Sequence, residues 1–170
     1  MALLLSTVSF LRGQNHFSKY EIGDSGCSAY FFTQPAPAEM SLSEDQSKVY
    51  IMESTDEQGN TYSTITVKLS ESIDAGSSEE LLISYMEYLK SSLNVIQSQG
   101  YVHGLQLTTH PAAAGIKDYW SDAESNGTVV GYVDTNFLVV MFVWQVENDP
   151  DIISKSDAFF KGFRFPGDSN

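Results

Sequence analysis

A chain of 170 residues in which 42% are hydrophobic and 12% aromatic is not intrinsically disordered, and it can bury a core without disulfides or metals. Nine Lys and Arg residues against 22 Asp and Glu residues give a net charge of −13, so we expect no nucleic-acid partner, because like charges repel a phosphate backbone. The same charge would attract a cation or a basic or amphipathic protein.

The first apolar segment covers residues 2–11, ALLLSTVSFL, and is followed by Arg12. It resembles the hydrophobic part of a secretory signal, although no basic residue precedes it. Two interpretations stay open: residues 1–16 keep the end of an export signal, or they add a first strand or helix to the fold. We favour export to a periplasmic or other extracytoplasmic compartment. Residues 17–170 are expected to form a single α+β domain.

The next elements are predicted to be strands. Residues 29–32 are aromatic and end before Pro35 and Pro37, as expected for a short strand. Residues 39–48 are polar and predict a loop. Residues 49–52 and 61–69 are rich in β-branched and aromatic side chains and flank the turn sequence DEQGN, which predicts a hairpin.

A long amphipathic helix is predicted over residues 78–98. Ser77 and Glu80 fit a capping box at its start, and Gly100 offers a stop at its end. Apolar residues recur at helical spacing and are expected to face the sheet: Leu82, Met86, Leu89, Leu93 and Ile96.

Four strands are predicted after the helix, joined by tight turns as in an antiparallel meander. They cover residues 101–109, 115–121, 128–133 and 137–146. Every residue from 137 to 144 is apolar, which indicates a central strand covered on both faces. Helices must therefore lie on both sides of the sheet, in three layers.

A second helix is predicted to begin at Asp149 as the N-cap and Pro150 as the first helical residue, and to run to about residue 160. Its inward residues are expected to be Ile152, Ile153, Ser156 and Phe159 or Phe160. Gly162 ends it, and residues 163–165 are expected to add a last short strand.

The order of these elements resembles the PsbP-like superfamily, which includes DcrB-like lipoproteins, a Ran-binding import factor and chaperones of type VI secretion effectors. The matching features are the strand before Pro35, the hairpin around Gly59, the helix closed by Gly100, the meander with Gly127 and Gly131, and the terminal FFKGFRF. The resemblance implies an antiparallel sheet sandwiched between helices, in a superfamily whose members mostly bind proteins. It carries over no functional residue.

Two residue patterns could indicate catalysis or metal binding, and each has a simpler interpretation. The sequence GDSG around Ser25 matches the core of a serine-protease motif, but its context does not fit, because only His16 precedes the Ser and Cys27 replaces the next expected Gly. A turn explains it, since Gly, Asp and Ser are the usual turn residues. His103 and His110 lie seven residues apart, which puts them on opposite faces of a strand, so we expect no metal site with Asp118 or Asp122.

A group of three carboxylates and the single cysteine are not expected to form a catalytic or metal site. Asp118, Asp122 and Glu124 are expected to lie in a solvated loop rather than to act as an acid and base pair. Cys27 is the only cysteine, which excludes an intrachain disulfide and a thiolate zinc site. We expect no cofactor and no lipidation at Cys27.

The sequence therefore predicts a non-catalytic module that binds a protein or peptide through an aromatic surface. The alternatives are a hydrolase-type enzyme with an active site assembled from scattered residues, and a carrier of a small molecule or lipid, which would need a closed apolar cavity. The surface is predicted to comprise Tyr85, Tyr88, Tyr119 and Trp120. Glu87, Asp118 and Asp122 would form an acidic rim that steers a basic ligand.

Overall fold

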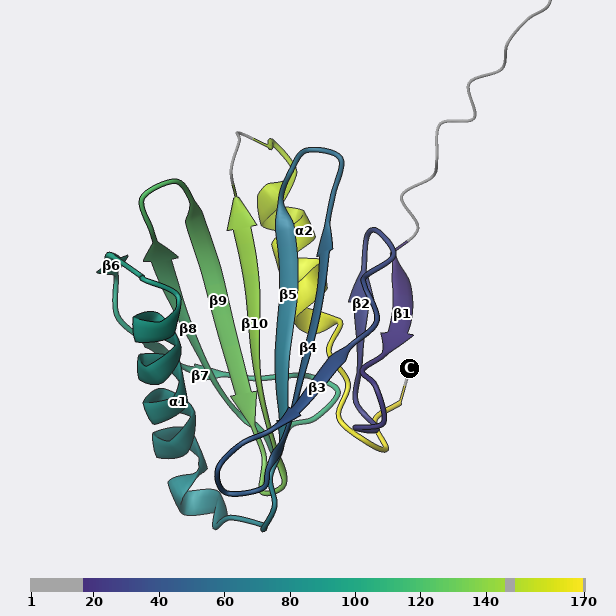
Figure 1. Ribbon diagram of the computed structural model, residues 1–170, viewed down its shortest axis with the longest axis vertical. Coiled ribbons are helices and arrows are strands. Elements are labelled where there is room, and N and C mark those ends of the chain that lie inside the picture. The colour runs from purple at the N-terminus through teal and green to yellow at the C-terminus, as the bar shows by residue number, and fades with distance from the viewer. Residues whose placement is uncertain (1–16, 146–148, 170) are drawn as a thin grey trace, which may run out of the picture.

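The protein is a three-layer α+β sandwich (Figure 1). The computed structural model describes residues 17–145 and 149–169. Its main sheet is antiparallel and eight-stranded, in the order β3-β4-β5-β10-β9-β8-β6, and β7 also pairs with β8. These strands are β3 (Glu39–Leu42), β4 (Lys48–Thr55), β5 (Thr61–Lys68), β6 (Gln97–Ser98), β7 (Val102–Leu105), β8 (Ala114–Ser121), β9 (Asn126–Val133) and β10 (Phe137–Gln145).

Strand β10 lies at the centre of this sheet, as predicted. It pairs with β5 on one side and with β9 on the other. All seven positions from Phe137 to Val143 are buried. Because successive side chains of a strand point to opposite faces, both faces of the sheet must be covered.

The predicted hairpin is confirmed as β4 and β5. The expectation of a loop over residues 39–48 is wrong in its first part, because residues 39–42 form the edge strand β3. All four residues of β3 are exposed. Met40 and Leu42 alternate with polar residues, but two apolar residues in an otherwise polar segment are too short a pattern to predict a strand.

Helix α1 (Ser78–Ser92) covers one face through Leu82, Met86 and Leu89, which are buried. It packs on β8 and β9. The predicted capping box is wrong: the Ser77 side chain makes no capping hydrogen bond. A 3₁₀ turn precedes the helix instead, and there the Asp74 carboxylate accepts the Gly76 N–H at 2.9 Å.

The helix also ends earlier than residue 98. Asn94 adopts the left-handed conformation with a φ of 54°, and its N–H bonds to the Ser91 carbonyl while the Val95 N–H bonds to the Lys90 carbonyl. These two bonds form a Schellman motif, which ends a helix. Leu93 is consequently 39% exposed, so its predicted inward orientation is wrong, as is that of Ile96, which is 66% exposed.

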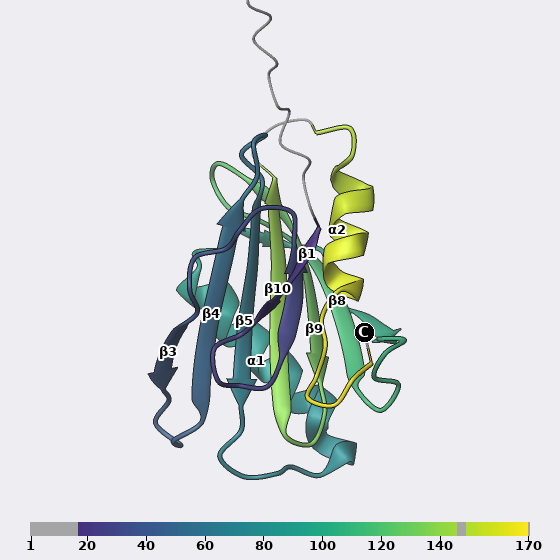
Figure 2. The same ribbon diagram turned by 90° about the vertical axis from the view of Figure 1, so that its right-hand side faces the viewer.

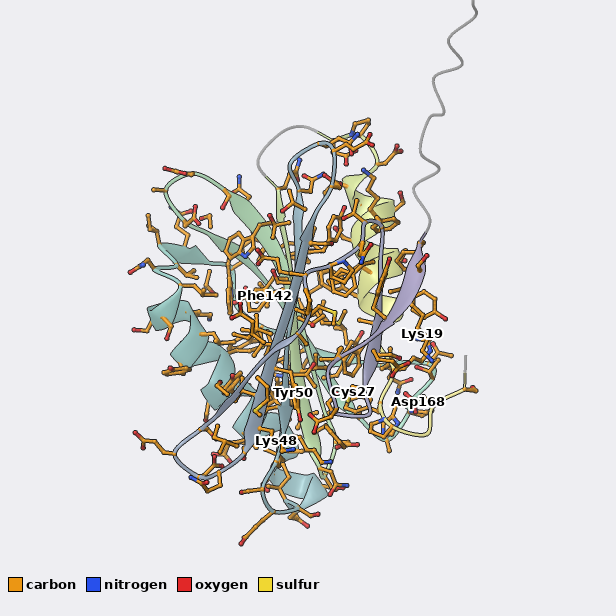
Figure 3. The ribbon with its side chains drawn as sticks, turned by 45° about the vertical axis from the view of Figure 1, so that its right-hand side comes forward. Lys19, Cys27, Lys48, Tyr50, Phe142 and Asp168 are labelled. Carbon is orange, nitrogen blue, oxygen red and sulfur yellow. The ribbon has the colours of Figure 1, made fainter. Side chains whose placement is uncertain are left out.

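The opposite face is covered by helix α2 (Ile152–Lys161) and by the hairpin of β1 (Ser18–Glu21) and β2 (Ser28–Phe31), as Figure 2 shows. The aromatic rings of Phe31 and Tyr62 each lie 5.3 Å from that of Phe159, centroid to centroid. Cys27 and Tyr50 belong to the same buried cluster (Figure 3). The predicted three-layer sandwich is therefore confirmed.

Helix α2 differs from its prediction at its start. Asp151, not Asp149, is the N-cap residue, and Asp149 accepts the Asp151 N–H at 2.9 Å. Ile153 is 81% exposed, so its predicted inward orientation is wrong. Gly162 ends the helix as expected. The strand predicted over residues 163–165 reduces to one bridge between Arg164 and Ser28.

Two sequence predictions fall on residues outside the described ones: the role of residues 1–16 and the extension of β10 to Val146. Neither of the helices in the described ranges is long and apolar enough to cross a membrane.

Candidate functional site

The candidate site is a groove of about 860 Å³ between α2 and the β6–β8 edge of the sheet. It exists because α2 lies over β10 and β2 and leaves the neighbouring part of the same sheet face open. We call it the α2 groove. Its wall is formed by α2 side chains that include Ile152, Ile153 and Phe160.

The floor of the α2 groove comes from alternate residues of three strands. Lys117 and Tyr119 on β8, Thr128 on β9 and Val143 on β10 line it. Lys117 is paired with Val130 and Tyr119 with Thr128, and paired residues of antiparallel strands point to the same face. The Lys117 ammonium lies 4.7 Å from the centre of the Tyr119 ring, so lysine and tyrosine form one amphipathic platform.

One end of the groove is polar. Gln97, Asn126 and Gln145 line it there, together with Ser121. Gln97 pairs with Ser121, and Ser121 pairs with Asn126, so these side chains form a row across neighbouring strand ends. Amide side chains offer both donors and acceptors, which suits them to bind the backbone of a peptide.

Of the four aromatic residues predicted to form a partner surface, Tyr119 and Trp120 are among the residues that line the α2 groove, and of these two Tyr119 presents an exposed ring, at 39%. Tyr88 is 64% exposed but projects from α1 on the other face of the sheet. Tyr85 is partly buried against the α1 side of the core. Trp120 is 1% exposed, so the expectation that its ring is available to a partner is wrong.

Trp120 is buried because β8 turns it toward α1, where its indole N–H donates to Asp118 Oδ2 at 2.7 Å. Asp118 also accepts from Ser98 Oγ at 2.6 Å and pairs with Lys90 at 3.2 Å. Burial raises the pKa of Asp118, but the hydrogen bonds from Ser98 and Trp120 outweigh it and hold that pKa below its ordinary value. Asp118 is thus a buried structural anion, and its predicted places in a solvated loop and in an acidic rim are wrong.

The other two predicted rim residues do not meet on one surface. Glu87 lies on α1, where it accepts from Lys90 and from the Tyr101 hydroxyl. Asp122 lies in the β8–β9 turn and accepts the N–H groups of Glu124 and Ser125. Asp122 and Glu124 lie in the chain between the lining residues Ser121 and Asn126, so they flank one end of the α2 groove without lining it, whereas Glu87 is on the other face.

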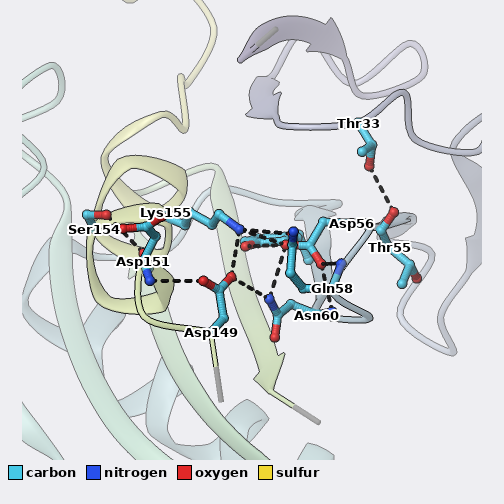
Figure 4. Close-up of polar contacts among 10 residues, drawn as sticks. Thr33, Thr55, Asp56, Gln58, Asn60, Asp149, Asp151, Ser154 and Lys155 are labelled. Carbon is cyan, nitrogen blue, oxygen red and sulfur yellow. Dashed lines mark hydrogen bonds and ion pairs between the residues drawn. The ribbon is translucent and has the colours of Figure 1, made fainter. Parts of the chain in front are cut away.

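A buried ionic cluster fixes α2 beside the groove (Figure 4). Lys155 on α2 donates to Asp149 at 2.6 Å and to Asp56 at 3.3 Å. The Asn60 amide bridges the same two carboxylates. The hydrogen bond from Lys155 holds the pKa of Asp149 below its ordinary value. Because breaking a buried ion pair is costly, this cluster holds the start of α2 against the β4–β5 turn.

The two histidines that the structure describes, His103 and His110, do not form a common metal site. His103 contacts Glu79 at 2.8 Å, whereas His110 contacts Asp168 at 2.7 Å and Asp134 at 3.4 Å. Within the described residues, no group of three or more His, Cys, Asp or Glu side chains is arranged to hold a metal ion.

The GDSG sequence forms a turn. Ser25 donates its hydroxyl proton to the Ile22 carbonyl at 2.6 Å and accepts the Cys27 N–H at 3.0 Å. Both residues are buried. Burial raises the pKa of the Cys27 thiol to about 12, which leaves it protonated and unreactive at neutral pH.

Sequence analysis missed most of the groove. Ile153 was expected in the core, while Thr128 and Gln145 were parts of strands without an assigned role. Each of the strands β8, β9 and β10 contributes only two or three side chains of the same face to the floor. The polar residues at the ends of these strands were the available signal that this part of the sheet is not covered by a helix.

Comparison with known proteins identifies the fold and no closer relationship. No protein family and no curated protein matches the chain in amino-acid sequence. The structure is similar to the solution structure of cyanobacterial PsbP (CyanoP) from Synechocystis sp. PCC 6803, with a TM-score of 0.52 and 12% identity. The alignment covers 95% of this chain and 98% of that chain. The protein therefore has a PsbP-like fold, which confirms the resemblance at the level of structure.

Proposed function

We propose that this PsbP-like protein is a non-catalytic binding module that holds a segment of another protein in the α2 groove. The observation that carries the proposal is the groove itself, in which apolar side chains of α2 line one wall and the sheet floor carries the exposed ring of Tyr119 and a row of amide and hydroxyl groups. Apolar pockets with a few convergent polar groups are typical binding sites.

The lining of the groove supports binding over hydrolysis. Among the described residues that line it, Lys117 and Asp157 carry charge, and none is His or Cys. The three described pairs of a histidine with a carboxylate, His103 with Glu79 and His110 with Asp134 and Asp168, lie outside this lining. A nucleophile, a base and an orienting group within hydrogen-bond reach, which covalent catalysis requires, are not brought together in this part of the chain.

The mixed lining also favours a peptide over a lipid. A lipid carrier would enclose its ligand in an apolar cavity, whereas this groove is open along the sheet and carries Gln97, Asn126 and Thr128 on its floor. An extended peptide can place its side chains against α2 and its backbone against these groups.

Peptide selection from a displayed library on the intact protein tests the proposal. Tyr119→Ala should weaken binding of the selected peptides by about 30-fold, since a central aromatic anchor is worth roughly 2 kcal/mol. Tyr88→Ala is the matched control, because Tyr88 is exposed on the other face, and it should leave binding unchanged. Failure to select any peptide, or equal effects of the two substitutions, would contradict the proposal.

A further inference from the structure

The charge around the α2 groove is uneven along its length. The polar end is lined by Asn126 next to the β8–β9 turn and by Pro150 just before α2, and this turn and the start of α2 lie at the same end of the sheet (Figure 1). The turn carries Asp122 and Glu124 beside the lining residues Ser121 and Asn126. From Asp118 to Thr128 there is no Lys or Arg, so this side of the groove end is purely acidic.

The start of α2 adds carboxylates on the other side of the same end. Asp151 is exposed and lies between the lining residues Pro150 and Ile152. Lys155, the first cation of this helix, is held by Asp56 and Asp149. It therefore does not neutralise Asp151. The negative charge of the carboxylates on the two sides is larger than the partial positive charge of about half a unit at a helix start, so the net charge at this end is negative.

The other end of the groove is different. Lys117 lies there on β8, four residues before Ser121, which corresponds to about 13 Å along a strand. Its ammonium lies over the Tyr119 ring. Between the two ends, the α2 wall presents Ile152, Ile153 and Phe160. The groove thus has an acidic mouth and an apolar wall. Further from the mouth its charged lining residues are Lys117 and Asp157, and Asp157 is paired with Lys161 at 2.6 Å.

We propose that the α2 groove takes a peptide segment with basic residues at one end and apolar residues in its middle, the basic end lying between the β8–β9 turn and the start of α2. This inference rests on the proposed function and specifies the chemistry of the partner. The net charge of −13 steers such a segment toward the protein, and the local carboxylates fix its direction in the groove.

Fluorescence anisotropy with three labelled peptides of equal length tests the inference. Each probe has the same leucine-rich middle and ends in three Lys, three Ser or three Glu residues. The Lys probe should bind at least tenfold more tightly than the Ser probe and show the strongest dependence on NaCl concentration, because exposed charges are screened by salt. Tyr119→Ala should weaken binding of the Lys probe, whereas Tyr88→Ala should not.

A matched pair of charge variants separates the groove end from the charge of the whole chain. The double variant Glu124→Gln with Asp151→Asn removes two charges at the groove end. The double variant Glu44→Gln with Glu71→Gln removes two charges from exposed residues outside its lining. The first should weaken binding of the Lys probe at least fivefold more than the second.

The possible results are decisive. Equal weakening by the two double variants would show attraction to net charge alone and overturn the inference. Equal affinity of the Ser and Lys probes, with both sensitive to Tyr119→Ala, would overturn the inference while leaving the proposed function intact. Absence of binding by all three probes, with peptides still selected from the library, would also overturn it.

Discussion

The contact between α1 and the sheet can be tested by one pair of residues. A methyl group added at Gly131 on β9 would lie 2.7 Å from Leu82 Cδ1, well below the roughly 3.5–4.0 Å of an optimal carbon contact. Leu82 is fully buried. Gly131→Ala should therefore destabilise the protein by about 1–3 kcal/mol, as overpacking does. In the absence of a clash, replacing a glycine within a strand would instead stabilise it by roughly 0.5–1 kcal/mol, so the sign of the change is informative.

The double variant gives the magnitude. Leu82→Ala alone removes buried methyl groups and should cost about 2–5 kcal/mol. When both substitutions are present, the new methyl occupies part of the space that the leucine vacated. The combined cost should be smaller than the sum by about 1–3 kcal/mol, in the range measured for residues in contact.

Urea unfolding followed by circular dichroism measures these free energies, and a constant m-value would show that the unfolding reaction is the same in each variant. Leu89→Ala is the control, because Leu89 lies about 10 Å further along α1 and should combine additively with Gly131→Ala. Additivity between Leu82→Ala and Gly131→Ala, or an increase in stability from Gly131→Ala alone, would refute the proposed close packing.

Three further predictions concern the buried groups Asp118 and Cys27 and the response to metal removal. The pKa of Asp118 is below its ordinary value of 3.8, so its contribution to stability is present above pH 4 and lost as the pH falls through the folded-state pKa. In Asp118→Asn the free energy of unfolding should therefore depend less on pH in this acid range. An unchanged pH dependence would contradict this. The Cys27 thiol, with a pKa of about 12, should react with a disulfide reagent at pH 8 only after unfolding, and rapid labelling of the native protein would disprove its burial. Chelator treatment should leave the melting temperature unchanged, whereas a drop of several degrees reversed by zinc would reveal a metal site.

Elements with a strong periodic pattern could be predicted from the sequence. Strand β10 is apolar from Phe137 to Trp144 because both of its faces are covered over most of its length, and this pattern alone places it at the centre of the sheet. The buried face of α1 through Leu82, Met86 and Leu89 follows in the same way from helical spacing. In both cases the faces covered by a neighbouring layer carry apolar residues, so the positions of the apolar residues indicate which faces are covered.

The end of α1 could not be predicted because two signals pointed past it. Leu93 and Ile96 continue the apolar spacing, and Gly100 is the more usual stop residue, yet the chain turns at Asn94. Asparagine tolerates the left-handed conformation, but nothing local distinguishes Asn94 from an asparagine inside a helix. The decisive interaction is β6 pairing with β8 at residues 97–98, which is a long-range contact.

The groove could not be predicted for a related reason. Its floor and wall come from β6, β8, β9, β10 and α2, and each element supplies only a few side chains. The choice of Tyr119 as a surface residue rested on its type, and the same reasoning failed for the adjacent Trp120. Alternation along β8 separates the two rings onto opposite faces, but only the position of α1 shows which face is covered.

Site-specific photo-crosslinking can locate a bound peptide on the α2 groove. A photoreactive phenylalanine analogue replaces Tyr119 in the α2 groove or Tyr88 on α1, and a peptide selected from the library is added before irradiation. Binding of the peptide in the α2 groove predicts a crosslinked product from position 119 and none from position 88, because the two side chains lie on opposite faces of the sheet. Crosslinking from position 88 alone, or from neither position while the peptide remains bound, would contradict binding in the α2 groove.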